Sequence, residues 1–238
     1  MTPSTISRGP APPGVDGPGP DHSEPPLRRD AARNRAKILA AARSAFGEDG
    51  VDVGVEVIAH RAGVGVGTLY RRFPTKELLI EAVIDELLDN VLAAADTGLA
   101  DDQPGEGFAQ YLRAVGQLQF EHSGCLTRLW NTTSADRRTQ ISDATRELLA
   151  RAQAAGAVRP DLVYEDVIVL FWSLRGVIET TSTVSPDAWL RHLDLLLGAL
   201  GSADRPLRFA PLTPEQVERA QQVSAAQAAP ARRSIPVG

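Results

Sequence analysis

The sequence predicts an all-α fold in two parts, and three observations support this. Apolar residues recur at helical spacing along most of residues 30–200, and no segment shows the alternation of a half-buried strand. Gly and Pro residues interrupt that spacing where helices would end. Charge is unevenly divided, because residues 28–76 hold ten Lys or Arg against five Asp or Glu in a chain of net charge −5. A basic module therefore precedes an acidic body.

Both ends of the chain have compositions that predict disorder. The first 27 residues contain eight prolines and few apolar residues, so we expect a disordered arm over residues 1–29. Residues 202–238 are expected to form a flexible tail. No signal-peptide pattern and no apolar run of about 20 residues is found. A single cysteine, Cys125, excludes an internal disulfide. We expect a cytoplasmic protein that makes no contact with a membrane.

Four helices account for the basic module and its continuation. Gly50 ends the first helix, Gly63 the second and Pro74 the third, while Thr75 can cap the fourth through its hydroxyl group. The predicted bounds are 30–49, 55–62, 66–73 and 76–95.

The body is predicted to continue with helices alone. Their expected bounds are 107–122, 124–131, 135–155, 163–182 and 187–200. Helix 163–182 is apolar around much of its circumference, which indicates burial on more than one side. Two-fold pairing is the commonest way to cover such faces. We therefore expect the last two helices to form a four-helix bundle with a second copy of the chain.

The stretch "AGVGVGTLYRRF" places Gly63, Gly65 and Gly67 at alternate positions, which suggests either a phosphate-binding loop or a corner between helices. A dinucleotide loop needs Gly-x-Gly-x-x-Gly after a strand, and the sixth position is Thr68 or Tyr70 instead. A P-loop also fails, since no Gly-Lys-Ser/Thr follows. A left-handed Gly63 between two short helices fits a helix–turn–helix.

The second helix of this motif has the side chains of a recognition helix. Val66, Leu69 and Phe73 are expected to turn inward. The residues left outside carry hydroxyl and guanidinium groups, which bind phosphates and base edges, and a glycine that lets the backbone approach closely. They are Gly67, Thr68, Tyr70, Arg71 and Arg72.

The segment "IAHRAGVGVGTLYRRFPTKELL" resembles the DNA-binding domain of TetR-family transcriptional regulators nearly position for position. The resemblance covers roughly residues 32–91. It implies a two-domain, all-α homodimer: an N-terminal three-helix DNA-binding domain at 30–76, with its helix–turn–helix at about 54–73, and a larger effector-binding and dimerisation domain at 77–201. It also implies a repressor that leaves a double-stranded DNA operator when a small molecule binds the body.

The resemblance places Thr68, Tyr70 and Arg71 at the DNA and Lys76 at a phosphate. The full set expected to contact DNA is Gly54, Val66, Gly67, Thr68, Tyr70, Arg71, Arg72 and Lys76. The family usually has Thr or Ser at the two helix caps, where this chain has Gly54 and Gly65. Glycine caps a helix nearly as well but has no hydroxyl group for a phosphate. Arg28 and Arg29, from the arm, are candidates to compensate.

The body offers only composition as a guide to an effector. The candidate effector-binding residues are His122, Trp130, Phe171, Trp172, Arg175 and Glu179. Both tryptophans can equally be core, and Arg175 with Glu179 can equally be a mutual pair at i, i+4. The surrounding residues suggest a mainly apolar ligand.

No catalytic set, metal site or cofactor motif stands out, so we expect none. Two alternatives to a ligand-released repressor remain open. One is a constitutive DNA-binding regulator without an effector, and the other is an enzyme whose active site is assembled from distant residues.

Overall fold

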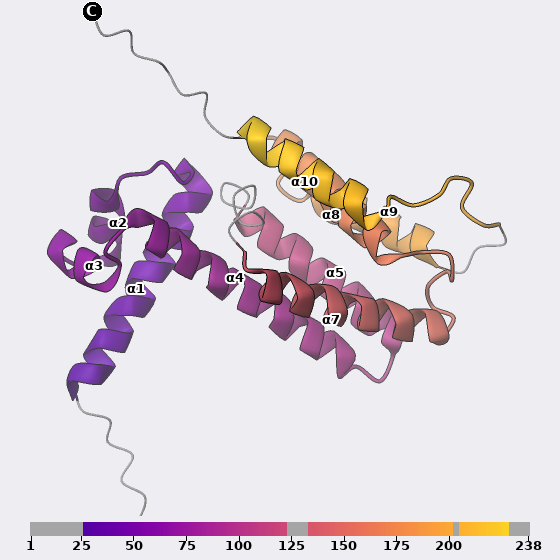
Figure 1. Cartoon of the computed structure of the whole chain (residues 1–238), viewed down its shortest axis with the longest axis horizontal. Coiled ribbons are helices and arrows are strands. Elements are labelled where there is room, and N and C mark those ends of the chain that lie inside the picture. The colour runs from indigo at the N-terminus through magenta and orange to yellow at the C-terminus, as the bar shows by residue number, and fades with distance from the viewer. Residues whose placement is uncertain (1–25, 123–132, 202–204, 229–238) are drawn as a thin grey trace, which may run out of the picture.

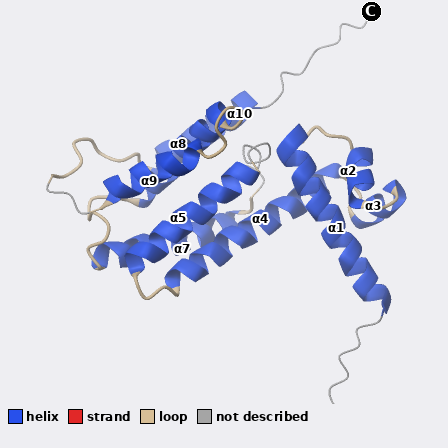
Figure 2. Cartoon of the chain, turned by 180° about the vertical axis from the view of Figure 1, so that it is seen from behind, coloured by secondary structure: helices blue, strands red, loops and turns tan. Residues whose placement is uncertain are grey.

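The structure, a computed structural model, describes residues 26–122, 133–201 and 205–228, in which every regular element is an α-helix. Helices α1–α3 lie together at one end, and α4 leads from them into a bundle of the remaining helices (Figures 1 and 2). The helices are α1 (Pro26–Asp49), α2 (Val55–Ala62), α3 (Val66–Arg72), α4 (Lys76–Leu99), α5 (Pro104–Glu121), α7 (Ala135–Ala154), α8 (Tyr164–Thr181), α9 (Ala188–Leu200) and α10 (Pro214–Ala228).

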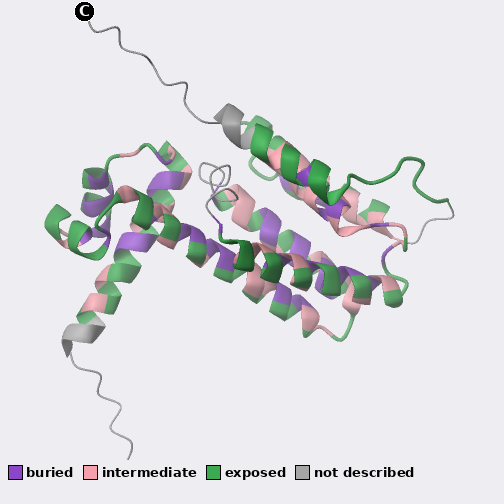
Figure 3. Cartoon of the chain, in the orientation of Figure 1, coloured by how far each residue is buried: buried purple, intermediate pink, exposed green. Residues whose placement is uncertain are grey.

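A first hydrophobic core joins α1 to α4. Its members follow the helical spacing of the sequence, with Ile38 and Phe46 from α1, Ile58 from α2 and Leu69 from α3 all at most 1% exposed. Helix α4 contributes five more residues, from Leu79 onward. The buried stripes of the four helices meet at this core in Figure 3.

A second core lies in the bundle of α5, α7, α8 and α9. Phe108, Leu112 and Leu174 are at most 1% exposed there, and Trp189 is 2% exposed. Helices α4 and α5 approach so closely that a Cβ on Gly98 would lie 2.5 Å from the backbone oxygen of Gly107. Only glycine allows that approach, so the α4–α5 crossing is fixed by sequence.

The first helix begins earlier than the sequence suggested. It starts at Pro26, so the expected disordered arm is wrong for residues 26–29. Proline is favoured at the first position of a helix, and Leu, Arg and Ala after it are good helix formers. Residues 1–25 of that arm, and the helix expected at 124–131, lie outside the described residues.

Helix α10 replaces part of the expected C-terminal tail. Its start carries a capping box: Thr213 Oγ1 accepts a hydrogen bond from the Gln216 amide at 3.3 Å, and Gln216 Oε1 accepts one from the Thr213 amide at 2.8 Å. Val217 is 5% exposed, and α10 packs against α8. The prediction of a flexible tail is therefore wrong for residues 214–228, where low hydrophobicity concealed good helix formers.

A polar clamp holds the segment that leads into α10. Arg159 and Asp161, in the connection between α7 and α8, form an ion pair with Nε and Oδ1 2.5 Å apart. Asp161 Oδ2 accepts the Leu207 amide at 2.7 Å, and Arg159 donates to the Arg205 carbonyl at 2.9 Å. The Arg159 guanidinium and the Leu207 amide hold the pKa of Asp161 far below its usual range.

Candidate nucleic-acid interface and ligand cavity

The corner between α2 and α3 has the geometry expected of a helix–turn–helix. Gly63 has φ 65° and ψ 33°, the left-handed conformation predicted for it, and its amide donates to the His60 carbonyl at 3.1 Å. Gly65 is the N-cap of α3 with φ −69°, so its backbone suits any residue. Only the first of the three alternate glycines is therefore required by the turn.

Helix α3 is held by one side and exposes the other. Leu69 is 1% exposed, and Phe73, which follows the helix, is 5% exposed. Tyr70 and Arg71 lie on the exposed surface, with 44% of Tyr70 accessible. Val66 is 36% exposed, so the expectation that it turns inward is wrong. It is the first residue of α3 and lies in a turn whose neighbours Gly65 and Gly67 are also exposed.

The two arginines that end α3 have different roles. Arg72 donates from Nη2 to the Ala31 carbonyl of α1 at 2.8 Å, which ties α3 to the first helix. Arg71 makes only a long contact of 3.4 Å from Nε to the Gly67 carbonyl of its own helix. Arg71 is therefore better placed to bind an external partner.

The remaining positions expected to contact DNA surround this surface. Gly54 and Gly67 are exposed, whereas Thr68 and Lys76 are half-buried. A Cβ built on Gly67 would meet nothing within 4 Å, and a glycine inside a helix costs about 1 kcal/mol relative to alanine. The fold thus gives no reason for glycine at this position. Thr75 caps α4 as predicted, because its Oγ1 accepts the Leu78 amide at 3.2 Å.

The described residues among those expected to bind an effector lie in two separate places. Phe171 packs edge-on against Tyr111 of α5, with ring centroids 6.3 Å apart. Arg175 Nε and Glu179 Oε1 lie 2.6 Å apart, which is the mutual pair considered as the alternative. Trp172 is half-buried on the same helix. Trp130 lies outside the described residues.

His122 lies elsewhere, at the end of α5 that faces α1 and α4. It is 8% exposed, and the charged groups of Glu121, Arg43 and Glu86 act on its ring. Burial lowers the pKa of His122, because it disfavours the imidazolium form. Arg43 of α1 pairs with Glu86 of α4 at 3.2 Å beside it. His122 therefore belongs to the junction between the two cores.

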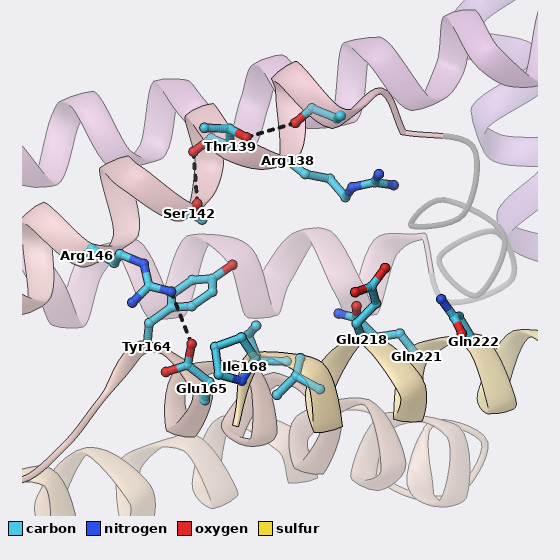
Figure 4. Close-up of a pocket in the computed structure, with 13 residues that line it drawn as sticks. Arg138, Thr139, Ser142, Arg146, Tyr164, Glu165, Ile168, Glu218, Gln221 and Gln222 are labelled. Carbon is cyan, nitrogen blue, oxygen red and sulfur yellow. Dashed lines mark hydrogen bonds and ion pairs between the residues drawn. The ribbon is translucent and has the colours of Figure 1, made fainter. Parts of the chain in front are cut away.

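A cavity of about 640 Å³ lies between α7, α8 and α10 (Figure 4). None of the five expected effector residues that the structure describes lines it. Its walls carry two arginines, two glutamates, two glutamines and several hydroxyl groups, so the prediction of mainly apolar surroundings does not describe it. The lining residues are Ala135, Arg138, Thr139, Ser142, Arg146, Tyr164, Glu165, Ile168, Pro214, Val217, Glu218, Gln221 and Gln222.

One wall of this cavity has a pattern that is visible in the sequence. Arg138, Ser142 and Arg146 are spaced by four residues and therefore share one face of α7. Arg146 lies 4.2 Å above the Tyr164 ring and pairs with Glu165 at 3.1 Å. Burial raises the pKa of Tyr164. The opposite wall is α10, and without that helix the polar face of α7 looks like ordinary surface.

Two absences hold for the described part of the chain. No helix there is long and apolar enough to cross a membrane. No group of three or more His, Cys, Asp or Glu residues there is arranged to hold a metal ion.

Two family models match the chain. The model for bacterial regulatory proteins of the tetR family matches residues 38–83, which contain α2 and α3. The model for the C-terminal domain of SbtR-like transcriptional regulators matches residues 103–201. The second match ends before α10 begins.

Curated regulatory proteins resemble the chain over a short segment. An HTH-type transcriptional regulator of Staphylococcus aureus is 42% identical over 64 residues, which are 26% of this chain and 35% of that protein. The chain thus spans about a third of the curated relatives it matches.

Solved structures match over a longer stretch. A TetR transcription regulatory protein from Mycobacterium vanbaalenii is 32% identical, with a TM-score of 0.57, over 74% of this chain and all of that one. A TetR transcriptional regulator from Streptomyces coelicolor is 34% identical, with a TM-score of 0.55, over 71% of this chain and 99% of that one. With its helix–turn–helix, its helical body and these relatives, the chain belongs to the TetR family of bacterial regulatory proteins.

Proposed function

We propose that the chain is a sequence-specific DNA-binding transcriptional regulator, and that it acts as a homodimeric repressor released from a pseudo-palindromic operator by a small molecule. The observation that carries the proposal is the outer face of α3. Gly67, Tyr70 and Arg71 are exposed there, on a helix that Leu69 holds firmly in the first core. Folding does not require these three residue types, whereas they suit contact with bases and phosphates.

Each protomer inserts α3 into the major groove, with Arg71 directed at base edges and Tyr70 and Lys76 at phosphates. The two half-sites lie about one helical turn, or roughly 34 Å, apart. Every phosphate neutralised lowers the affinity by roughly 0.9 log unit per log unit of salt. We assign α1–α3 and the start of α4 to the DNA-binding domain and the remainder of the body to dimerisation and effector binding.

Exposed apolar side chains on α8 and α9 support the dimer. Val169 is 39% exposed, Leu190 41% and Leu195 65%, and these helices pack against each other. A Leu195→Glu variant is expected to sediment as a monomer and to lose cooperative operator binding. Val223→Glu provides the matched control, because Val223 is a 51% exposed residue of α10 and belongs to neither α8 nor α9. Equal dimerisation by wild type and Leu195→Glu would contradict this interface.

Helix α4 supports coupling between the effector and DNA. Leu87 and Leu88 of α4 are buried in the first core, and Ala95 is buried in the second. Asp89 of α4 also pairs with Arg137 of α7. A ligand that binds more tightly to the body when α4 is tilted changes the spacing of the two α3 helices. The ligand can act only if its affinities for the tilted and the DNA-bound states differ.

Selection of bound sequences from a random DNA pool by the purified full chain tests the proposal. A two-fold symmetric motif with fixed half-site spacing is the expected result. Salt-sensitive binding with no enriched sequence would overturn sequence-specific recognition. An enriched but asymmetric single site would retain recognition by α3 and overturn the dimeric operator.

A further inference from the structure

The cavity between α7, α8 and α10 has the size of a small-molecule site, since such sites measure roughly 300–1,000 Å³ and this cavity measures about 640 Å³. One of its walls is α10, which lies beyond the residues 103–201 that the C-terminal family model matches. The cavity is therefore built partly from a segment outside the matched family domains.

The end of the cavity at Arg146 is already neutral. Arg146 pairs with Glu165 at 3.1 Å, and only 9% of the Glu165 side chain is exposed. The Tyr164 ring covers the same guanidinium group at 4.2 Å. A charged ligand group would gain little here, because each charge has a partner within the protein.

The other end places opposite charges on opposite walls. In Figure 4, Arg138 extends from α7 and Glu218 rises from α10 on the facing side of the cavity. Arg138 donates to the Thr133 carbonyl at 2.9 Å, and a guanidinium group has five donor hydrogens in all. A ligand group between the two walls fits this pair of charges when it accepts a hydrogen bond on the α7 side and donates one on the α10 side.

The middle of the cavity combines polar and apolar contacts. Ser142 donates to the Thr139 carbonyl at 3.0 Å, so its oxygen remains an acceptor. Gln221 and Gln222 add amide groups from α10, while Ile168 and Val217 provide an apolar strip. Such a lining suits a molecule with one polar and one apolar edge.

We propose that this cavity binds a small organic molecule of zero net charge, whose planar head both donates and accepts hydrogen bonds between Arg138 and Glu218 and whose apolar edge lies on Ile168 and Val217. A primary amide has such a head. That this molecule is the effector rests on the function proposed above.

Three probes with one ring system and different head groups test the proposal: naphthalene-2-carboxamide (neutral), 2-naphthoate (anionic) and 2-naphthamidine (cationic). Binding to the full chain is measured by calorimetry and ligand-observed NMR. We expect the carboxamide to bind about tenfold more tightly than either ion, because each ion faces a like charge on one wall.

Variants then change the order of affinities in opposite directions. Glu218→Gln removes the carboxylate and is expected to strengthen naphthoate binding several-fold, and Arg138→Gln is expected to strengthen naphthamidine binding. Arg219→Gln, the next and exposed residue of α10, does not line the cavity and should leave the order unchanged. Val217→Asp, which separates α10 from α8, should weaken all three probes.

Two results would overturn the proposal: no binding of any probe to the wild-type chain, or an order of affinities that neither Glu218→Gln nor Arg138→Gln changes. Operator binding is measured on the same samples. Intact operator binding without probe binding would overturn the cavity alone, and probe binding without sequence-selective DNA binding would overturn the proposed function alone.

Discussion

Helices α3 and α10 are both surface helices that bury little, yet they are held in different ways. In α3 the single buried residue, Leu69, enters a core shared by four helices, and the left-handed Gly63 sets its direction. Among residues 214–223 of α10, whose burial the structure describes, the buried residue is Val217, which belongs to neither core. The Arg159–Asp161 clamp holds the segment before the helix. Because α3 is anchored in a core, it presents a fixed surface. Helix α10 is held mainly through the segment that precedes it, so it can change position to fit a molecule in the cavity.

The largest expected difference is between the two anchoring residues. Leu69→Ala should destabilise the chain by about 2–5 kcal/mol, the range for a buried leucine, and abolish DNA binding with it. Val217→Ala should leave global unfolding within about 0.5 kcal/mol, because α10 is released without opening either core. Denaturant unfolding of both variants measures this, and equal destabilisation would show that α10 belongs to the cooperative core.

Next in size is the effect of Arg71 on the DNA complex. Arg71→Ala should cost about 1–3 kcal/mol of operator affinity if the guanidinium binds a base edge in two places. The unfolding midpoint should not change, since Arg71 makes only one long contact within the described residues. Arg219→Ala on α10 is the matched control. Fluorescence anisotropy with the selected operator measures the dissociation constants of these variants. An unchanged dissociation constant for Arg71→Ala would show that Arg71 does not contact the DNA.

Gly67 should show two smaller effects of opposite sign. Gly67→Ala is expected to stabilise the chain by about 0.5–1 kcal/mol, because a Cβ there meets nothing within 4 Å and alanine favours helix. The same methyl group should weaken operator binding by keeping the α3 backbone from the DNA. A thermal melt and a DNA titration of one sample test both, and stabilisation with unchanged affinity would place the backbone away from the DNA.

The smallest expected effect is the contribution of His122 to the pH dependence of stability. His122 lies at the junction between the first and second cores. Its pKa is lowered in the folded chain by burial, so the unfolded chain binds a proton more readily near its ordinary pKa of about 6.5. His122 therefore favours folding above that pH, and stability is lost as the pH falls through 6.5 towards the folded pKa. Urea unfolding of wild type and His122→Gln between pH 5 and 8 should give a flatter profile for the variant. Parallel profiles would exclude His122 as the source.

The helix–turn–helix could be predicted because its determinants are local. Apolar spacing, Gly63 and Pro74 lie within one short stretch, and each has a direct conformational meaning. The separate role of Arg72 could not be predicted, since its partner Ala31 is 41 residues away. The prediction that Val66 turns inward is wrong because its spacing matches the buried stripe, while its position at the start of α3 exposes it.

The body was harder to predict because its features depend on tertiary contacts. Thr213 and Gln216, which form the capping box, mark the start of α10 in the sequence. One buried valine among residues 214–223 gives no amphipathic pattern there. The cavity then depends on α10, so its lining could not be assembled from sequence. The aromatic residues of α8 suggested an effector pocket, yet Phe171 packs against Tyr111.

The position of Ile141 has a consequence for the order in which the protein can be made. This residue of α7 is 7% exposed and belongs to the first core, although the other members of that core lie between Ile38 and Leu88. A chain growing on the ribosome from its N-terminus will have released α1–α4 well before α7 appears. The first core is therefore completed only when roughly half of the body has been synthesised, which ties the maturation of the N-terminal domain to the domain that follows it.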